Sequence, residues 1–129
     1  RSTLFPYTTL FRSERCGMVG TARGFGAFLQ DQLQEHSALF SDRARRLFYE
    51  IQRNTGGAPV PMTLGWHVDD RQNTQCFYKE GGGGGFHCMM RLYPSAGLGS
   101  VVMTNATGFN VRSTMDAVDR ECLRPSDWG

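Results

Sequence analysis

One short segment combines a single positive charge with a backbone that carries almost no side chains. Lys79 is the only lysine beside thirteen arginines, and Glu80 and then five glycines, Gly81–Gly85, follow it. The run is typical of a strand end that carries one positive charge beside a backbone that a ligand can approach closely, because glycines have no Cβ and also let the chain turn. The same run is compatible with a flexible hairpin loop. Its order excludes a G-x-x-x-x-G-K-[ST] phosphate loop, in which the lysine follows the glycines.

Four acidic and histidine side chains are of types that can bind a metal. His67, Asp69, Asp70 and His87 match no metal-binding signature in their spacing. We therefore predict surface or hydrogen-bonded histidines and no metal.

The four cysteines also lack a metal or redox motif. Cys16, Cys76, Cys88 and Cys122 contain no C-x-x-C pair, so we predict small buried hydrophobic residues. A disulfide between two of them stays open if the protein is exported.

Hydrophobic periodicity predicts the elements that must position Lys79. A helix pair is expected over 21–53, with Thr21 and Ser41 as N-caps, and a last helix over 111–122, capped by Asn110. Strands are expected at four places: Thr63–Val68, Thr74–Glu80, Phe86–Tyr93 and Leu98–Thr104.

Short connections rich in turn formers favour an antiparallel meander, because parallel strands need long crossovers. The predicted fold class is therefore α+β, an antiparallel sheet flanked by helices. Side chains expected in the core or on the buried helix stripes are Phe25, Phe28, Leu29, Leu33, Ala44, Leu47, Phe48, Ile51, Trp66, Phe86, Met89, Met90, Leu92, Val111, Met115, Val118 and Cys122.

Composition excludes several protein classes. With 40% hydrophobic and 20% charged residues the chain is an ordinary globular protein. A net charge of +2 with scattered arginines does not predict a nucleic-acid partner. No apolar run approaches the roughly 20 residues of a membrane span.

The first residues need a separate interpretation. The segment 1–13, RSTLFPYTTLFRS, corresponds codon for codon to a translated short-read sequencing adapter. We expect it to be adapter-derived and exclude it from the fold prediction. Residues 14–129 then have the length of one domain, and the compartment cannot be predicted from a leader.

Three sequence blocks carry a family resemblance. Phe77–Gly82 (FYKEGG), then Gly85-Phe86-His87, then 97–105 (GLGSVVMTN) resemble the C-terminal part of the penicillin-recognising serine hydrolases. The match covers roughly 19–118 and is most similar to the class C β-lactamase, D,D-peptidase and esterase branch. It implies an incomplete part of the β-lactamase/transpeptidase-like fold, in which Lys79-Glu80-Gly81 stands where the family has K-T-G or H-x-G.

The resemblance implies a mechanism and roles for single residues. In the family, the serine of an S-x-x-K motif attacks a carbonyl and forms an acyl-enzyme. Lys79 would supply a fixed positive charge, and Gly82 a backbone N–H for the oxyanion hole. Substrate contacts would come from Glu80, Gly81, Gly83 and His87. The implied partner is a small acyl substrate, an ester, amide or β-lactam, without a cofactor, and a periplasmic or secreted location fits the family.

Glu80 departs from the hydroxyl residue that usually stands at the centre of the triplet. A carboxylate cannot donate a hydrogen bond to a substrate's acid group and would repel it. A neutral ester, amide or peptide is therefore expected rather than penicillin, unless strand alternation turns Glu80 to the face opposite Lys79.

The nucleophile of the family is missing from the sequence. The residue three places before Lys79, the only lysine, is Cys76, so no S-x-x-K motif exists, and no Y-x-N is present. Two hypotheses follow. The chain is the C-terminal portion of a serine hydrolase and inactive alone, or it is a non-catalytic domain that binds a small ligand or a partner.

Overall fold

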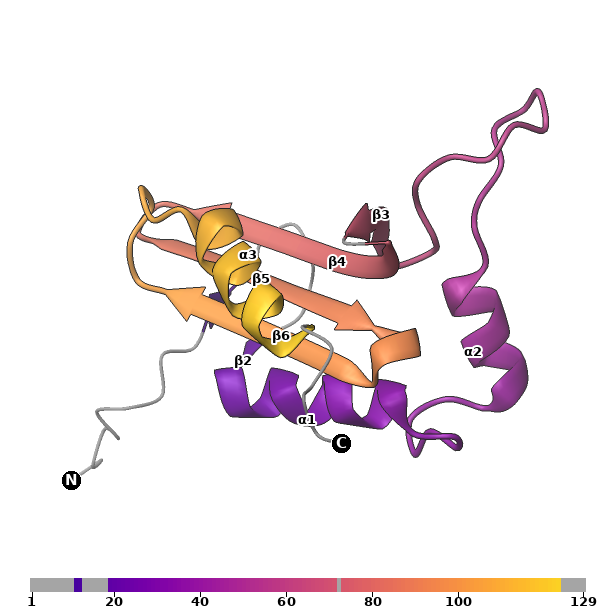
Figure 1. Cartoon of the computed structure of the whole chain (residues 1–129), viewed down its shortest axis with the longest axis horizontal. Coiled ribbons are helices and arrows are strands. Elements are labelled where there is room, and N and C mark those ends of the chain that lie inside the picture. The colour runs from indigo at the N-terminus through magenta and orange to yellow at the C-terminus, as the bar shows by residue number, and fades with distance from the viewer. Residues whose placement is uncertain (1–10, 13–18, 72, 124–129) are drawn as a thin grey trace.

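The structure, a computed structural model, describes residues 11–12, 19–71 and 73–123. It has the predicted α+β architecture, with a four-stranded antiparallel sheet in the order β3-β4-β5-β6 (Figure 1). Each strand pairs with the next one in the chain, which confirms the meander. The elements are β1 Phe11–Arg12, β2 Val19–Gly20, α1 Ala22–Leu33, α2 Asp42–Tyr49, β3 His67–Arg71, β4 Thr74–Gly83, β5 Phe86–Tyr93, a 3-10 turn Pro94–Ala96, β6 Leu98–Thr104 and α3 Val111–Cys122.

The three predicted N-caps are all present. The side chains of Thr21, Ser41 and Asn110 each accept a hydrogen bond from the backbone N–H three residues further on, at 3.0 to 3.2 Å. Each bond satisfies one of the amides that a helix start leaves without an intrahelical partner. The helix starts were therefore readable from the sequence.

The second helix is shorter than predicted. It ends at Tyr49 instead of continuing toward 53, and Leu47 on its expected apolar stripe is 48% exposed. Beyond the helix the N–H of Gln52 donates to the carbonyl of Met62 at 2.8 Å, and the N–H of Val60 donates to that of Gln52 at 2.9 Å. The chain pairs there with itself as an extended ribbon, so nonlocal bonds replace the predicted last helical turn.

The first strand of the sheet was predicted four residues too early. The range Thr63–Val68 begins with a tight turn, in which the Thr63 hydroxyl accepts from the N–H of Trp66 at 3.1 Å and the Thr63 N–H donates to the Trp66 carbonyl at 2.8 Å. Strand β3 starts after this turn and includes 69–71, which the sequence pattern assigns to a connection. The turn to β4 contains Asn73 with a positive φ of 59°.

The remaining strands follow the prediction more closely. β5, β6 and α3 have the predicted bounds, and Gly97 ends the turn between the two strands with a left-handed φ of 62°. β4 is longer than predicted, because Gly81–Gly83 continue the strand and only Gly84 and Gly85 form the turn.

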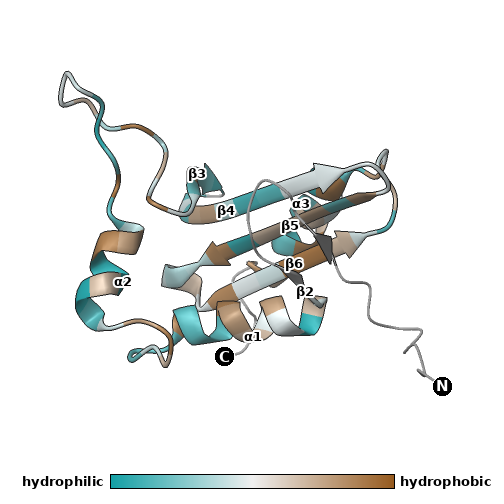
Figure 2. Ribbon diagram, turned by 180° about the vertical axis from the view of Figure 1, so that it is seen from behind, coloured by the Kyte–Doolittle hydropathy of each residue, from teal (hydrophilic) through white to brown (hydrophobic). Residues whose placement is uncertain are grey.

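An apolar layer covers the sheet face on which α1 lies. Leu29 of α1 packs with Phe77 and Leu92 of the sheet, and Trp66 completes this cluster. As predicted, Trp66 lies between helices and sheet, with its ring 6.3 Å from that of Tyr49. Figure 2 shows hydrophobic segments along β5 and β6, whereas β3 is hydrophilic.

The opposite face is covered by α3. Val111 and Met115 of the predicted apolar stripe are buried and pack on Met89, but Val118 is 45% exposed and Cys122 is also exposed. Asp119 takes the buried place on this helix, so the predicted stripe is wrong in its second half. None of the helices in the described part of the chain could span a membrane.

Candidate functional site

The lysine and glycine segment lies at an open edge of the sheet. β3 pairs with β4 only as far as His67↔Tyr78, whereas β5 pairs with β4 to its end at Gly83↔Phe86. Among the described strands, Lys79–Gly83 therefore has a partner on one side only. The other side presents backbone groups that are open to a ligand or another strand.

The register decides which backbone groups face this edge. The pair Gly83↔Phe86 closes the hairpin across a two-residue turn, and such a turn is closed by a mutually hydrogen-bonded pair. Bonded and non-bonded pairs alternate along antiparallel strands, so Gly82↔His87 is a non-bonded pair. The N–H of Gly82 consequently points away from β5, and Gly82 is exposed. This is the orientation that an oxyanion donor needs.

Alternation places Lys79 and Glu80 on opposite faces. Lys79 lies opposite Met90 on the α1 face, whereas Glu80 lies opposite Met89 on the α3 face. The orientation that the sequence left open is thus the one in which Glu80 turns away from Lys79. A substrate beside Lys79 would not meet this carboxylate, so repulsion by Glu80 is no argument against an anionic substrate.

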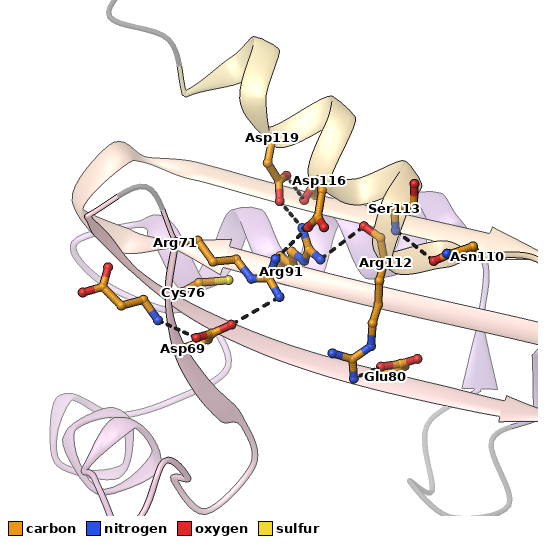
Figure 3. A network of polar contacts seen from close by, with 12 residues as sticks. Asp69, Arg71, Cys76, Glu80, Arg91, Asn110, Arg112, Ser113, Asp116 and Asp119 are labelled. Atoms are coloured by element: carbon orange, nitrogen blue, oxygen red, sulfur yellow. Dashed lines mark hydrogen bonds and ion pairs between the residues drawn. The ribbon is translucent and has the colours of Figure 1, made fainter.

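Both carboxylate oxygens of Glu80 have a side-chain partner. Its Oε1 lies 2.9 Å from Nε2 of His87, and its Oε2 pairs with Arg112, which reaches over from α3 (Figure 3). The Arg112 guanidinium also lies 5.7 Å from the centre of the Tyr78 ring. Burial would raise the pKa of Glu80, but the hydrogen bonds from Arg112 and His87 outweigh it and hold that pKa below its usual value. The hydrogen bond with Glu80 raises the pKa of Arg112.

Packing and backbone conformation explain why several positions of the run are glycine. A Cβ on Gly83 would come within 2.6 Å of the Phe86 ring, and one on Gly82 would lie 3.3 Å from the His87 ring. Gly85 has a φ of +90°, which disfavours other residues. The run is therefore an ordered strand end and turn, and the alternative of a flexible loop does not describe Gly81–Gly83.

A buried ion network beneath α3 was missed by the sequence analysis. Arg91 of β5 is fully buried, and its Nη1 lies 2.6 Å from Oδ2 of Asp119 and 2.7 Å from Oδ1 of Asp116 (Figure 3). The hydroxyl of Tyr93 donates to Asp119 at 2.6 Å. The sequence feature that could have revealed the network is Asp119, which follows Met115 by four residues and therefore falls on the buried stripe of the helix. The network fixes α3 on the sheet, and Arg91 also donates to the carbonyl of Arg112 at 3.5 Å.

The cysteine prediction holds for only part of the set. Cys76 is buried, and burial raises the pKa of its thiol, which disfavours a nucleophilic thiolate. Cys88 is half-buried, its thiol donating to the Gly81 carbonyl at 3.3 Å, and Cys122 is exposed, contrary to the prediction. Cys16 lies outside the described residues.

The other predicted side chains are not gathered into a site. His67 stacks on Tyr78 with ring centres 5.2 Å apart, and the described residues contain no group of three side chains that could hold a metal. An open pocket lies along α2, lined by Arg43, Arg46, Leu47, Tyr49 and Glu50, and includes neither Lys79 nor the glycines.

Comparison with known families gives one result. The sequence model of the family described as Beta-lactamase matches residues 8–122. The match extends through every element from β1 to α3 and includes part of the adapter-like segment, whose origin stays a prediction. No curated protein and no solved structure matches the chain. The antiparallel sheet with its helices is consistent with part of a β-lactamase-like fold.

Proposed function

The chain belongs to the Beta-lactamase family, and from this premise we propose that it is the C-terminal portion of a serine hydrolase. In this proposal β4 forms one wall of an active site that cleaves an ester, amide or β-lactam through an acyl-enzyme. The nucleophilic serine belongs to sequence outside this chain, because the chain has no S-x-x-K motif.

One observation carries the proposal. At the open edge of the sheet, the N–H of Gly82 points outward three residues after Lys79, the only lysine. A backbone donor at an unpaired edge can bind the oxygen of a tetrahedral intermediate without first breaking a bond within the sheet. Lys79 is half-buried on the α1 face of this strand and would supply a fixed positive charge that favours an ionised base and a carboxylate-bearing substrate.

The orientation of Glu80 affects the substrate class. Since Glu80 lies on the α3 face, nothing acidic from the triplet faces the Lys79 side, and a substrate with a carboxylate fits as well as a neutral one. We keep ester, amide and β-lactam as candidate substrates. Gly81 and Gly83, on the same face as Lys79, are the residues of the run that we propose to line this wall.

The proposal is tested in the intact reading frame and in the chain by itself. Alone, the chain should not hydrolyse a p-nitrophenyl ester or a chromogenic β-lactam. In the intact enzyme, Gly82→Pro removes the N–H at an unpaired edge position and should lower kcat about 100- to 1000-fold. Lys79→Ala should lower the acylation rate while the fold persists.

A neighbouring glycine provides the matched control. A Cβ at Gly84 meets no atom within 4 Å, so Gly84→Ala should leave kcat unchanged. The proposal is wrong if Gly82→Pro and Lys79→Ala retain the wild-type rate, or if the chain alone turns over substrate.

A further inference from the structure

We infer that Glu80, His87 and Arg112 form a clamp that positions the Gly82 N–H from the face of the sheet opposite to Lys79. The inference rests on the proposed function, which makes this N–H an oxyanion donor. It gives Glu80 and His87 a positioning role in place of the substrate contact that the sequence predicted for them.

The clamp begins with a carboxylate that is held at both oxygens. His87 lies 2.9 Å from Oε1 of Glu80, and Arg112 pairs with Oε2. The side chains of Glu80 and His87 are only 22% and 23% exposed. Charge-assisted hydrogen bonds at partly desolvated positions are stronger and more directional than ion pairs in water. Glu80 is therefore tied to α3 and to β5 at once.

His87 passes this restraint to Gly82. The two residues are register partners, and the His87 ring occupies the space beside the Gly82 Cα, 3.3 Å from where a Cβ would stand. The other ring nitrogen, Nδ1, lies 3.1 Å from the carbonyl oxygen of Phe109, just before the N-cap of α3. Each ring nitrogen of His87 therefore faces an oxygen, one on Glu80 and one on Phe109.

The restraint is needed because this part of β4 is intrinsically loose. Glycines have more backbone freedom than any other residue, and β3 gives no support beyond Tyr78. An oxyanion donor must be held within about 0.5 Å of its productive position. A second tie stabilises the turn, where the N–H of Gly85 donates to the Thr107 hydroxyl at 2.7 Å. The clamp restrains this strand end from the α3 face of the sheet. The edge of β4 that β3 does not cover can therefore stay open at Gly82.

The test is backbone ¹⁵N relaxation on the full chain, which requires neither substrate nor serine. In the wild type the Gly82 N–H should have an order parameter of about 0.85, typical of rigid backbone. Glu80→Ala removes the contacts of this residue with His87 and with Arg112 and should lower the order parameter of Gly82 below about 0.6, whereas that of Gly99 in β6 should not change. Arg112, whose side chain is 51% exposed, provides a second variant with little risk to folding. Arg112→Ala should lower the same order parameter, and Arg112→Lys should restore part of it.

Arg120 provides the matched control. It is an exposed arginine in the last turn of α3, so Arg120→Ala removes the same charge without touching the clamp and should leave Gly82 rigid. The clamp is refuted if Gly82 stays equally rigid in folded Glu80→Ala or, should that variant not fold, in Arg112→Ala. It is also refuted if Arg120→Ala mobilises Gly82 as much. Failure of the oxyanion role would appear separately, as wild-type activity of Gly82→Pro in the intact enzyme.

Discussion

The two faces of the sheet are stabilised in different ways. On the α1 face, Leu29, Trp66, Phe77 and Leu92 form a continuous apolar cluster. On the α3 face, a smaller apolar cluster lies between two charged groups, the buried pair Arg91–Asp119 and the clamp of Glu80, His87 and Arg112. An apolar contact tolerates small shifts, whereas a buried charge must keep its partner. The α3 face therefore fixes the position of α3 and of the glycine strand more narrowly.

Among the substitutions that compare the two faces, the largest loss of stability is expected at Asp119. Asp119→Ala leaves the fully buried Arg91 with only the partly exposed Asp116, which it shares with Arg71, and it also removes the acceptor of the Tyr93 hydroxyl. Breaking a buried pair in this way costs about 3–5 kcal/mol. Urea unfolding followed by far-UV circular dichroism should show a lower midpoint with an unchanged slope.

A double variant sharpens this result. Replacing both charges by apolar residues of similar size, Arg91→Met with Asp119→Leu, should cost much less than the sum of the two single changes, because no charge is left unpaired. Strict additivity of the two changes would show that the pair contributes by packing alone and would remove the distinction between the faces.

A smaller loss is expected on the apolar face. Leu29 of α1 is 2% exposed, and Leu29→Ala should cost about 2–3 kcal/mol, the lower part of the range for such truncations. Phe28 and Leu33 beside it are only partly buried, so the helix can settle toward the sheet and fill some of the cavity. The same urea experiment measures the loss of stability in Leu29→Ala. A loss as large as that of Asp119→Ala would mean that this face is packed as rigidly as the charged one.

The sequence predicted the elements that local pattern determines. The caps Thr21, Ser41 and Asn110 and the bounds of β5, β6 and α3 follow from hydrogen-bonding side chains, from alternation and from turn residues close in the chain. The errors occurred where contacts between distant segments determine where an element begins or ends. The pairing of Gln52 with Met62 ended α2 early, and the turn around Trp66 delayed β3.

The candidate site shows the same limit. The sequence identified Lys79 and the glycines, but the face of Glu80 depends on the register with β5, which a single strand cannot reveal. Arg112 was not considered, because it lies 32 positions from Glu80 and meets it only when α3 folds over the sheet. Asp119 was assigned no role for the same reason, since its partner Arg91 comes from another element.

The smallest predicted effect is a pH dependence of the clamp. Because the pKa of Glu80 is lower in the folded chain than the ordinary 4.5, its ionised form stabilises the fold above about pH 4.5, and this contribution is lost as pH falls through the folded value. The pair is partly exposed, so less than about 1 kcal/mol is expected. The free energy of unfolding of the wild type, measured from pH 6 to pH 3, should fall more steeply than that of Glu80→Gln.

In an Arg112→Ala background, the difference in pH dependence between the chain with Glu80 and its Glu80→Gln variant should largely disappear. The Arg112 hydrogen bond is the strongest of the interactions that lower the pKa of Glu80. Other carboxylates titrate in both proteins and cancel in the difference. Parallel pH curves for wild type and Glu80→Gln would contradict an ionised, paired Glu80. A weak pH effect at Glu80, beside the large loss of stability expected for Asp119→Ala, is the expected pattern, because a clamp at the rim of the sheet can position a strand while contributing little to global stability.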